Sequence, residues 1–152
     1  MNGNGFGLFR VGTGGVPSSF YSEDLIIKGF TITEGAATSG SIFSSASSTS
    51  ATCSYLFEDL KCMNNWSGNG AFFFTTVNGP KIDFKNCLFD GCNSFNGGAL
   101  HFTTTPNSTI TIDGCAFNNC HAENGGAIYN TTGATATGGI FKFILQNIFF
   151  DR

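Results

Sequence analysis

The chain has little charge and no long hydrophobic run. Lys and Arg together number 7 and Asp and Glu 10 in 152 residues, which gives a formal net charge of −3. A chain without a basic patch is a poor partner for nucleic acid or for an anionic membrane surface. No apolar stretch approaches the twenty residues of a transmembrane helix, so we expect no membrane insertion.

The usual signatures of metal, redox and phosphate sites are also missing. Six cysteines are present but no C-x-x-C pair, so neither a zinc site nor a thioredoxin-like site is expected. The Gly-Gly pairs are not followed by Lys-Ser/Thr or by a helix start, which argues against a phosphate-binding loop. We therefore expect no metal and no cofactor.

The first and last residues bear on whether the chain is part of a longer one. The first residues, MNGNGFGLFR, include neither a basic region nor an uninterrupted apolar stretch, so they are not a secretory signal. At the other end, Asn147 to Arg152 begin a repeat and stop before its second strand. Two explanations stay open: the chain is an excerpt of a longer solenoid, or its ends stack head to tail into a filament.

What the chain does contain is one sequence motif, called the phrase below, that occurs twice. CLFDGCNSFNGGALHF begins at Cys87, and CAFNNCHAENGGAIYN begins 28 residues later at Cys115, with the same spacing of cysteines, phenylalanine and Gly-Gly-Ala. Self-similarity at a fixed period indicates an architecture of stacked units. Before each phrase the sequence alternates apolar and polar residues, which is typical of strands, and no capped apolar stripe of helix length occurs.

This pattern predicts an all-β parallel β-helix of about five coils, each of two or three short strands. Residues 1–152 form one such domain or a segment of a longer one. The coil anchors form an inward column of Ile32, Phe57, Phe89, Phe117 and Phe150. A second inward column is expected to contain Phe30, Tyr55, Cys87, Cys115 and Ile148, and a third Phe43, Phe72, Leu100 and Ile128.

Glycines and cysteines complete the expected coil. Corners that need positive φ or close backbone approach are assigned to Gly97, Gly98, Gly125 and Gly126. Cys87 is expected to stack on Cys115 and Cys92 on Cys120. At that spacing they are either buried thiols or disulfides between coils, and the sequence leaves both open.

The phrases resemble the repeat of chlamydial polymorphic outer membrane proteins. The shared features are F-x-x-[CN] and G-G-A-[IVL], here Phe89 to Cys92 with Gly97 to Leu100, and Phe117 to Cys120 with Gly125 to Ile128. The coil anchored on Phe57 matches in part, with Leu60 in place of the cysteine and a four-residue insertion before Asn69. Related repeats occur in other bacterial and protist surface proteins. The resemblance implies a right-handed β-helix displayed outside the cell, often as an adhesin.

Three sets of outward residues are candidate sites. Alternation places Phe73, His101 and Tyr129 on the outside, where an aromatic column could contact a protein or a sugar. Threonine columns run beside them, one through Thr75, Thr103 and Thr131 and one through Thr76, Thr104 and Thr132. Asparagine sequons that could carry glycans lie at Asn65, Asn107 and Asn130.

The sequence thus predicts an extracellular or cell-surface structural protein: a rigid stalk, filament subunit or adhesin. Its partners would be copies of itself stacked end to end, neighbouring coils of a longer chain, or a host or cell-surface protein or glycan. A carbohydrate-binding or polysaccharide-degrading β-helix is the alternative, and an ice-binding threonine array is a second. Catalysis would need paired carboxylates, but Glu58, Asp90 and Asp151 are expected in one column without a partner acid, so no enzyme is predicted.

Overall fold

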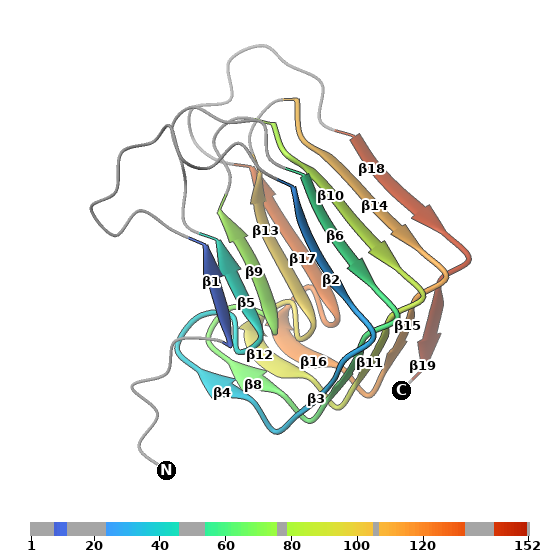
Figure 1. Ribbon diagram of the computed structural model, residues 1–152. Helices are drawn as coiled ribbons and strands as arrows, with labels where there is room; N and C mark the ends of the chain where they lie inside the picture. Colours follow the sequence, from blue (N-terminus) through green and yellow to red (C-terminus); the bar gives the residue numbers. More distant parts are fainter. Residues whose placement is uncertain are drawn as a thin grey trace.

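The protein is a parallel β-solenoid, as the repeat predicts (Figure 1). The computed structural model describes residues 8–11, 24–45, 54–75, 79–104, 107–132 and 142–151. Every strand pair within these ranges is parallel, and all neighbours come from successive turns of the chain. The turns that begin at residues 54 and 81 have a hydrogen-bonded neighbour on both sides in all four sheets, and the turn that begins at residue 109 has one on both sides in its first two strands.

The turns stack into four sheets, each named here by its first strand. The β2 sheet contains β2 (Leu25–Lys28), β6 (Ser54–Glu58), β10 (Lys81–Lys85), β14 (Thr109–Asp113) and β18 (Lys142–Gln146). The β3 sheet contains β3 (Thr31–Thr33), β7 (Lys61–Met63), β11 (Leu88–Asp90), β15 (Ala116–Asn118) and β19 (Phe149–Asp151). The β4 sheet contains β4 (Ala36–Ala37), β8 (Trp66–Ser67), β12 (Asn93–Asn96) and β16 (His121–Asn124). The β1 sheet contains β1 (Phe9–Val11), β5 (Phe43–Ser45), β9 (Phe72–Thr75), β13 (Leu100–Thr104) and β17 (Ile128–Thr132).

A turn therefore has four strands where the sequence predicts two or three. The extra element is the β4 sheet, which forms the lower side of the solenoid in Figure 1. Its first two strands are only two residues long, Ala-Ala and Trp-Ser, and carry no apolar alternation. Their identity as strands comes from backbone pairing, of β4 with β8 and of β8 with the longer β12, which periodicity cannot detect.

Left-handed residues form the corners between the sheets. Between the β2 and β3 sheets every turn bends at a residue with positive φ, and these are Gly29, Asp59, Asn86, Gly114 and Asn147. The next corner uses Glu34, Asn64, Gly91 and Asn119, and the third uses Gly40, Gly70, Gly97 and Gly125. Glycine, asparagine and aspartate tolerate this conformation best, so their recurrence once per turn shapes the coil.

The Gly-Gly corners combine both properties expected of them. Gly97, Gly125 and Gly126 have φ of 55°, 75° and 54°. Gly98 is required by space instead, because a Cβ there would lie 2.5 Å from the Cys92 carbonyl oxygen and 2.8 Å from that of His121. Gly97, Gly98 and Gly125 therefore leave no room for a side chain at the point where the β4 sheet turns into the β1 sheet, whereas the space around Gly126 is open and only its positive φ favours glycine.

Stacked phenylalanines fill most of the interior. Phe89 and Phe117 lie with ring centroids 4.9 Å apart and planes 7° apart, and the Phe57 and Phe84 rings stack at 4.8 Å. Phe74 and Phe102 form a further stack on the β1 sheet side. The third predicted column is confirmed by the register, which pairs Phe43 with Phe72, Phe72 with Leu100, and Leu100 with Ile128.

The register corrects the anchor of the second turn. Phe57 pairs with Ile27 and Phe84 in the β2 sheet, so it does not belong to the Ile32 column. Cys62 takes that place, between Ile32 and Phe89. The left-handed corner at Asp59 ends β6 immediately after Phe57 and Glu58, which fixes Phe57 one sheet earlier than the sequence match implies.

Two further positions shift with this correction. Tyr55 pairs with Leu25 and Ile82, and Leu60 takes its expected place beside Cys87. Asn65 replaces the cysteine of the F-x-x-[CN] motif, and Asn69 bridges directly to Asn96, so the second turn contains no four-residue insertion. Phe117 and Phe150 do stack as predicted, but Phe150 is 56% exposed, and among the described residues only β15 pairs with its strand.

Candidate functional site

The predicted threonine column is present on the β1 sheet. Thr75, Thr103 and Thr131 lie side by side in register, and all three are half-buried. The Oγ1 atoms of Thr103 and Thr131 are 3.3 Å apart, and Thr131 Oγ1 donates to the Phe102 carbonyl at 3.4 Å. Thr76 and the side chains of Thr104 and Thr132 lie outside the described residues. The hydroxyls bond to the protein itself, which favours a structural ladder over an ice-binding array.

The aromatic column beside it is not an open contact surface. Phe73, His101 and Tyr129 are in register, with ring centroids 4.9 Å and 5.2 Å apart. However, His101 is only 6% exposed, so the prediction that it faces solvent is wrong. Neither imidazole nitrogen has a hydrogen-bond partner within the part of the chain that the structure describes, and burial lowers the pKa of His101 to about 4. His101 is therefore a neutral ring packed between two aromatic neighbours.

The cysteines of the described turns are free thiols in the interior. Cys62, Cys87, Cys92 and Cys115 are buried and Cys120 is half-buried. The Cys87 amide donates to Cys115 Sγ at 3.4 Å, and the hydrogen bond with Cys115 together with burial raises the pKa of the Cys87 thiol. Burial likewise raises the pKa of Cys62. The hydrogen bond with the partner thiol lowers the pKa of Cys92 and of Cys115, but all of these thiols lie in the interior, where they act as small core side chains.

The acidic residues are divided between two sheets. Glu58 is paired with Lys28 and lies between Lys28 and Lys85 in register, so its expected position beside Asp90 is wrong. The hydrogen bond from Lys28 lowers the pKa of Glu58, with a smaller charge effect of Lys85. Asp90, Asn118 and Asp151 do share a column on the β3 sheet. Within the described ranges no three His, Cys, Asp or Glu side chains are grouped closely enough to hold a metal ion.

One of the three predicted glycan sites is closed. Asn65 is 1% exposed, accepts a hydrogen bond from the Gly35 amide at 3.0 Å and donates one to the Met63 carbonyl at 3.2 Å. The folded chain therefore offers no access to the Asn65 amide, and Asn65 is the weakest of the three predicted glycosylation sites. Asn107, at a turn with φ of 69°, and Asn130 are both exposed.

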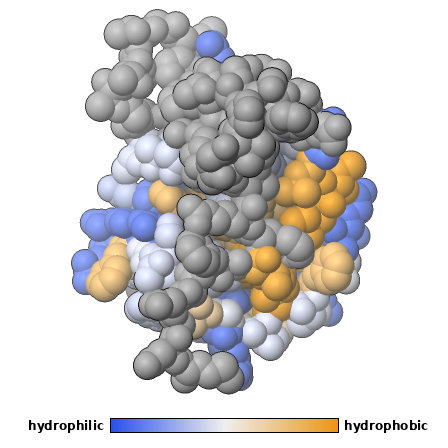
Figure 2. All heavy atoms as spheres, turned by 60° about the vertical axis from the view of Figure 1, so that its left-hand side comes forward, coloured by the Kyte–Doolittle hydropathy of each residue, from blue (hydrophilic) through white to orange (hydrophobic). Residues whose placement is uncertain are grey.

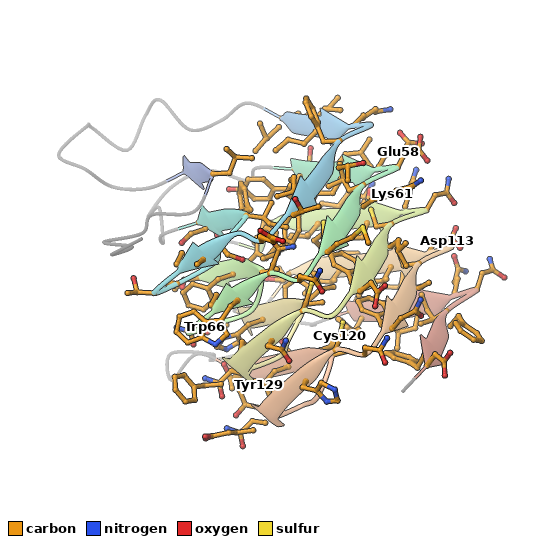
Figure 3. All side chains as sticks on the ribbon, turned by 90° about the horizontal axis from the view of Figure 1, so that it is seen from below. Glu58, Lys61, Trp66, Asp113, Cys120 and Tyr129 are labelled. Carbon is orange, nitrogen blue, oxygen red and sulfur yellow. The ribbon has the colours of Figure 1, made fainter. Side chains whose placement is uncertain are left out.

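The most distinctive surface lies on the β4 sheet, which sequence reasoning missed. Trp66 from β8 and Phe95 from β12 are each 52% exposed there. They line a shallow hollow of about 320 Å³ together with residues of β12 and β16, including Asn93, His121 and Glu123. Figure 3 views the molecule from below and labels Trp66 on this side. The β8, β12 and β16 face of this sheet is called the Trp66 face below.

The register fixes the order of side chains on the Trp66 face. Trp66, Asn93 and His121 lie directly beside one another on three successive turns. Phe95 lies two residues beyond Asn93, opposite Glu123, since the residues on either side of these two are paired. Asn93 is anchored by its own amide, which donates to the Gly91 carbonyl at 2.9 Å. Trp66 and Phe95 thus lie diagonally on neighbouring strands, with Cα atoms about 7–8 Å apart and polar groups between them.

An asparagine ladder borders this surface at the corner to the β1 sheet. Asn124 Nδ2 donates to Asn96 Oδ1 at 3.0 Å, and Asn96 Nδ2 donates to Asn69 Oδ1 at 3.2 Å. The ladder links three turns through side-chain amides and holds the ends of β12 and β16 in place. Asparagine immediately before each corner glycine, in Asn69-Gly70, Asn96-Gly97 and Asn124-Gly125, is the sequence signal for it.

Comparison with known proteins adds no relative to this description. No protein-family model, no curated protein and no solved structure matches the chain. Across the ranges that the structure describes, no helix has the length and apolar character needed to cross a membrane.

Proposed function

We propose that the chain is a rigid module of an extracellular or cell-surface protein, a right-handed β-helix of about five coils that serves as a stalk, filament subunit or adhesin. Right-handedness is supported by the strong general preference of parallel strand crossovers. The surface location is supported by the resemblance of its phrases to repeats of chlamydial polymorphic outer membrane proteins. The structural role is supported mainly by apolar residues of the core columns that are exposed at the two ends of the described solenoid.

Core columns reach the surface at both ends of the solenoid. Phe30, on the first described turn, and Leu145 and Phe150, on the last, occupy inward columns and yet are 53%, 47% and 56% exposed. Figure 2 shows a patch of hydrophobic side chains on the face that it presents. Exposed strand edges and apolar columns of this kind favour the addition of another parallel strand.

The two end faces match one another. If β18 and β19 of one copy paired with β2 and β3 of the next in the same register, Leu145 would meet Ile27 and Phe150 would meet Ile32. Gln146 would meet Lys28, so the outer column would bring no like charges together. Either a second copy or a neighbouring coil of a longer chain would continue the existing columns, and we propose that copies of this chain stack end to end.

Sedimentation velocity over a range of concentrations tests this assembly. We expect reversible growth beyond the monomer, with elongated particles in electron micrographs. Phe150→Glu should abolish the growth by placing a charge in the continued core column, whereas Gln146→Ala, on the neighbouring strand but facing outward, should preserve it. A wild-type chain that stays monomeric at all concentrations would refute end-to-end stacking.

Glycosylation offers a separate test of the extracellular location. When the chain is passed through a eukaryotic secretory pathway, Asn107 and Asn130 should be modified and Asn65 should not, which peptide mass spectrometry can resolve. Modification of Asn65 would mean that its turn is open during folding. No observation among the described residues specifically supports the enzymatic or the ice-binding alternative.

A further inference from the structure

The β4 sheet, which carries the Trp66 face, has its small side chains inward and its large ones outward, the reverse of the other sheets. Its inward residues are small or polar, with Ala37 and Ser67 at most 3% exposed, while its outward residues include the two half-exposed aromatic rings. Aromatic rings on the outside bury little apolar area within this chain, so folding does not account for them. Exposed aromatic rings grouped around a hollow are typical of a binding surface.

We propose that the Trp66 face binds a short neutral glycan of one or two sugar rings. The hollow of about 320 Å³ lies at the lower end of the usual range for small-ligand sites, roughly 300–1,000 Å³. A pyranose presents an apolar C–H face, which packs on an aromatic ring, and a rim of hydroxyl groups that require hydrogen bonds. Trp66 and Phe95 supply the rings, and Asn93, His121 and Glu123 supply donors and acceptors around them.

The polar groups distinguish a sugar from a purely apolar partner. Asn93 is held by its bond to the Gly91 carbonyl, which leaves Oδ1 without a donor among the residues that the structure describes. Asn93 lies between Trp66 and His121 in register, so this acceptor sits beside the larger ring. A hydrophobic protein surface would leave such groups unpaired, whereas the hydroxyls of a sugar would satisfy them.

Charge selects the class of glycan. Glu123 lies opposite Phe95 on the neighbouring strand, and the chain carries a net charge of −3. A carboxylate or sulfate on the sugar would be repelled by Glu123, and no lysine or arginine lines the hollow within the described residues. The ligand is therefore a neutral glycan rather than an acidic one.

The chain provides its own probe, because Trp66 is its single tryptophan. Titration with the neutral trisaccharides cellotriose, chitotriose, laminaritriose and maltotriose should change Trp66 emission in a saturable way for at least one of them. A millimolar dissociation constant corresponds to about 4 kcal/mol, which is the weakest binding that we expect. A trimer of galacturonic acid should bind at least about tenfold more weakly than the best neutral sugar.

Variants separate the site from general surface effects. Phe95→Ala leaves the reporter in place and should weaken binding at least about tenfold. Phe149→Ala removes a ring that is 58% exposed on a different sheet and should leave the affinity unchanged. Thermal melts of both variants check that they remain folded.

Several results would overturn the proposal. These are the absence of saturation with all four neutral sugars, wild-type affinity in Phe95→Ala, or tighter binding of the acidic trimer. A change of emission with protein concentration in the absence of sugar, lost in Phe95→Ala, would identify the face as a contact between copies. Because the assembly proposed above uses the end faces, failure of either proposal leaves the other intact.

Discussion

The β3 and β4 sheets follow one another along the chain, yet the large side chains point inward in the β3 sheet and outward in the β4 sheet. In the β3 sheet, stacked Phe89 and Phe117 face inward and are buried, and their outward neighbours in β11 and β15 are half-buried. In the β4 sheet, Ser67 is buried while Trp66 beside it is half exposed. The first arrangement stabilises the solenoid, and the second places its large rings where they contribute little to stability.

The difference follows from the small amount of internal space beside the β4 sheet, which is called the thin side of the solenoid below. The corner backbone at Gly98 lies so close to the backbone at the start of β12 and β16 that a Cβ added there would clash with the Cys92 and His121 carbonyl oxygens. Little room is left inside for large side chains, so Ser67 and Asn65 fill the space and satisfy backbone groups. The aromatic residues of this sheet are then free to serve a purpose other than packing.

The largest effect should come from the aromatic stack. Phe89→Ala or Phe117→Ala removes a fully buried ring and should lower the free energy of unfolding by roughly 3–5 kcal/mol. Chemical denaturation measures this loss, and Phe89→Leu, which keeps most of the volume, should lose much less. A loss below about 1 kcal/mol for Phe89→Ala would contradict the column assignment.

A pH-dependent effect is expected at His101, on the β1 sheet. Burial lowers the pKa of the folded state to about 4, below the usual 6.5, so the neutral ring favours folding. This contribution is fully present above pH 6.5 and is lost as the pH falls, by about 3 kcal/mol at pH 4.

His101→Phe is the matched variant, because it fills the same place between Phe73 and Tyr129 without a titrating group. The difference in unfolding free energy between the variant and the wild type should grow in favour of the variant between pH 6.5 and 4. The carboxylates titrate in both proteins and cancel in this difference. A constant difference across that range would show that His101 reaches solvent.

The thin side should respond to loss of a hydrogen bond rather than loss of volume. Asn65→Ala removes the acceptor of the Gly35 amide and a donor to the Met63 carbonyl, which should cost about 2 kcal/mol. Asn124→Ala removes one exposed bond of the asparagine ladder and should cost well under half of that. Equal losses of unfolding free energy in the two variants, measured by denaturant melts, would mean that the buried hydrogen bonds of Asn65 stabilise the fold no more than the exposed bond of Asn124.

The sequence predicts the solenoid well because its signal is repetition. The two phrases at Cys87 and Cys115 differ by one full turn, so the stacking of Phe89 on Phe117 follows from spacing alone. The second turn is harder, because Cys62 and Asn65 replace the residues that mark the motif and Phe57 offers a false match. The match of Phe57 to the Ile32 column puts it in the wrong register, because a pattern of apolar side chains can fit more than one alignment of the strands. The turn geometry and the backbone pairing decide which residues are neighbours.

The candidate site was harder to predict than the fold. Alternation identifies Phe73, His101 and Tyr129 as a column, but it cannot tell that His101 is buried. Trp66 and Phe95 stand in strands too short or too polar to be recognised. The one signal is alternation from Cys92, which is buried, because a residue three positions later in an extended chain points to the opposite face, and that residue is Phe95.

The smallest expected effect is the most informative for the comparison of the two sheets. Phe95→Ala and Trp66→Ala remove large rings from positions that are half exposed, and each should change the free energy of unfolding by less than about 0.5 kcal/mol. Chemical denaturation followed by far-UV circular dichroism measures both, since the Trp66 variant has no tryptophan signal. A loss above about 2 kcal/mol in either would place that ring among the packed residues, and its exposure would then need no ligand to explain it. Near-zero losses would leave two large aromatic side chains on the Trp66 face without a role in stability.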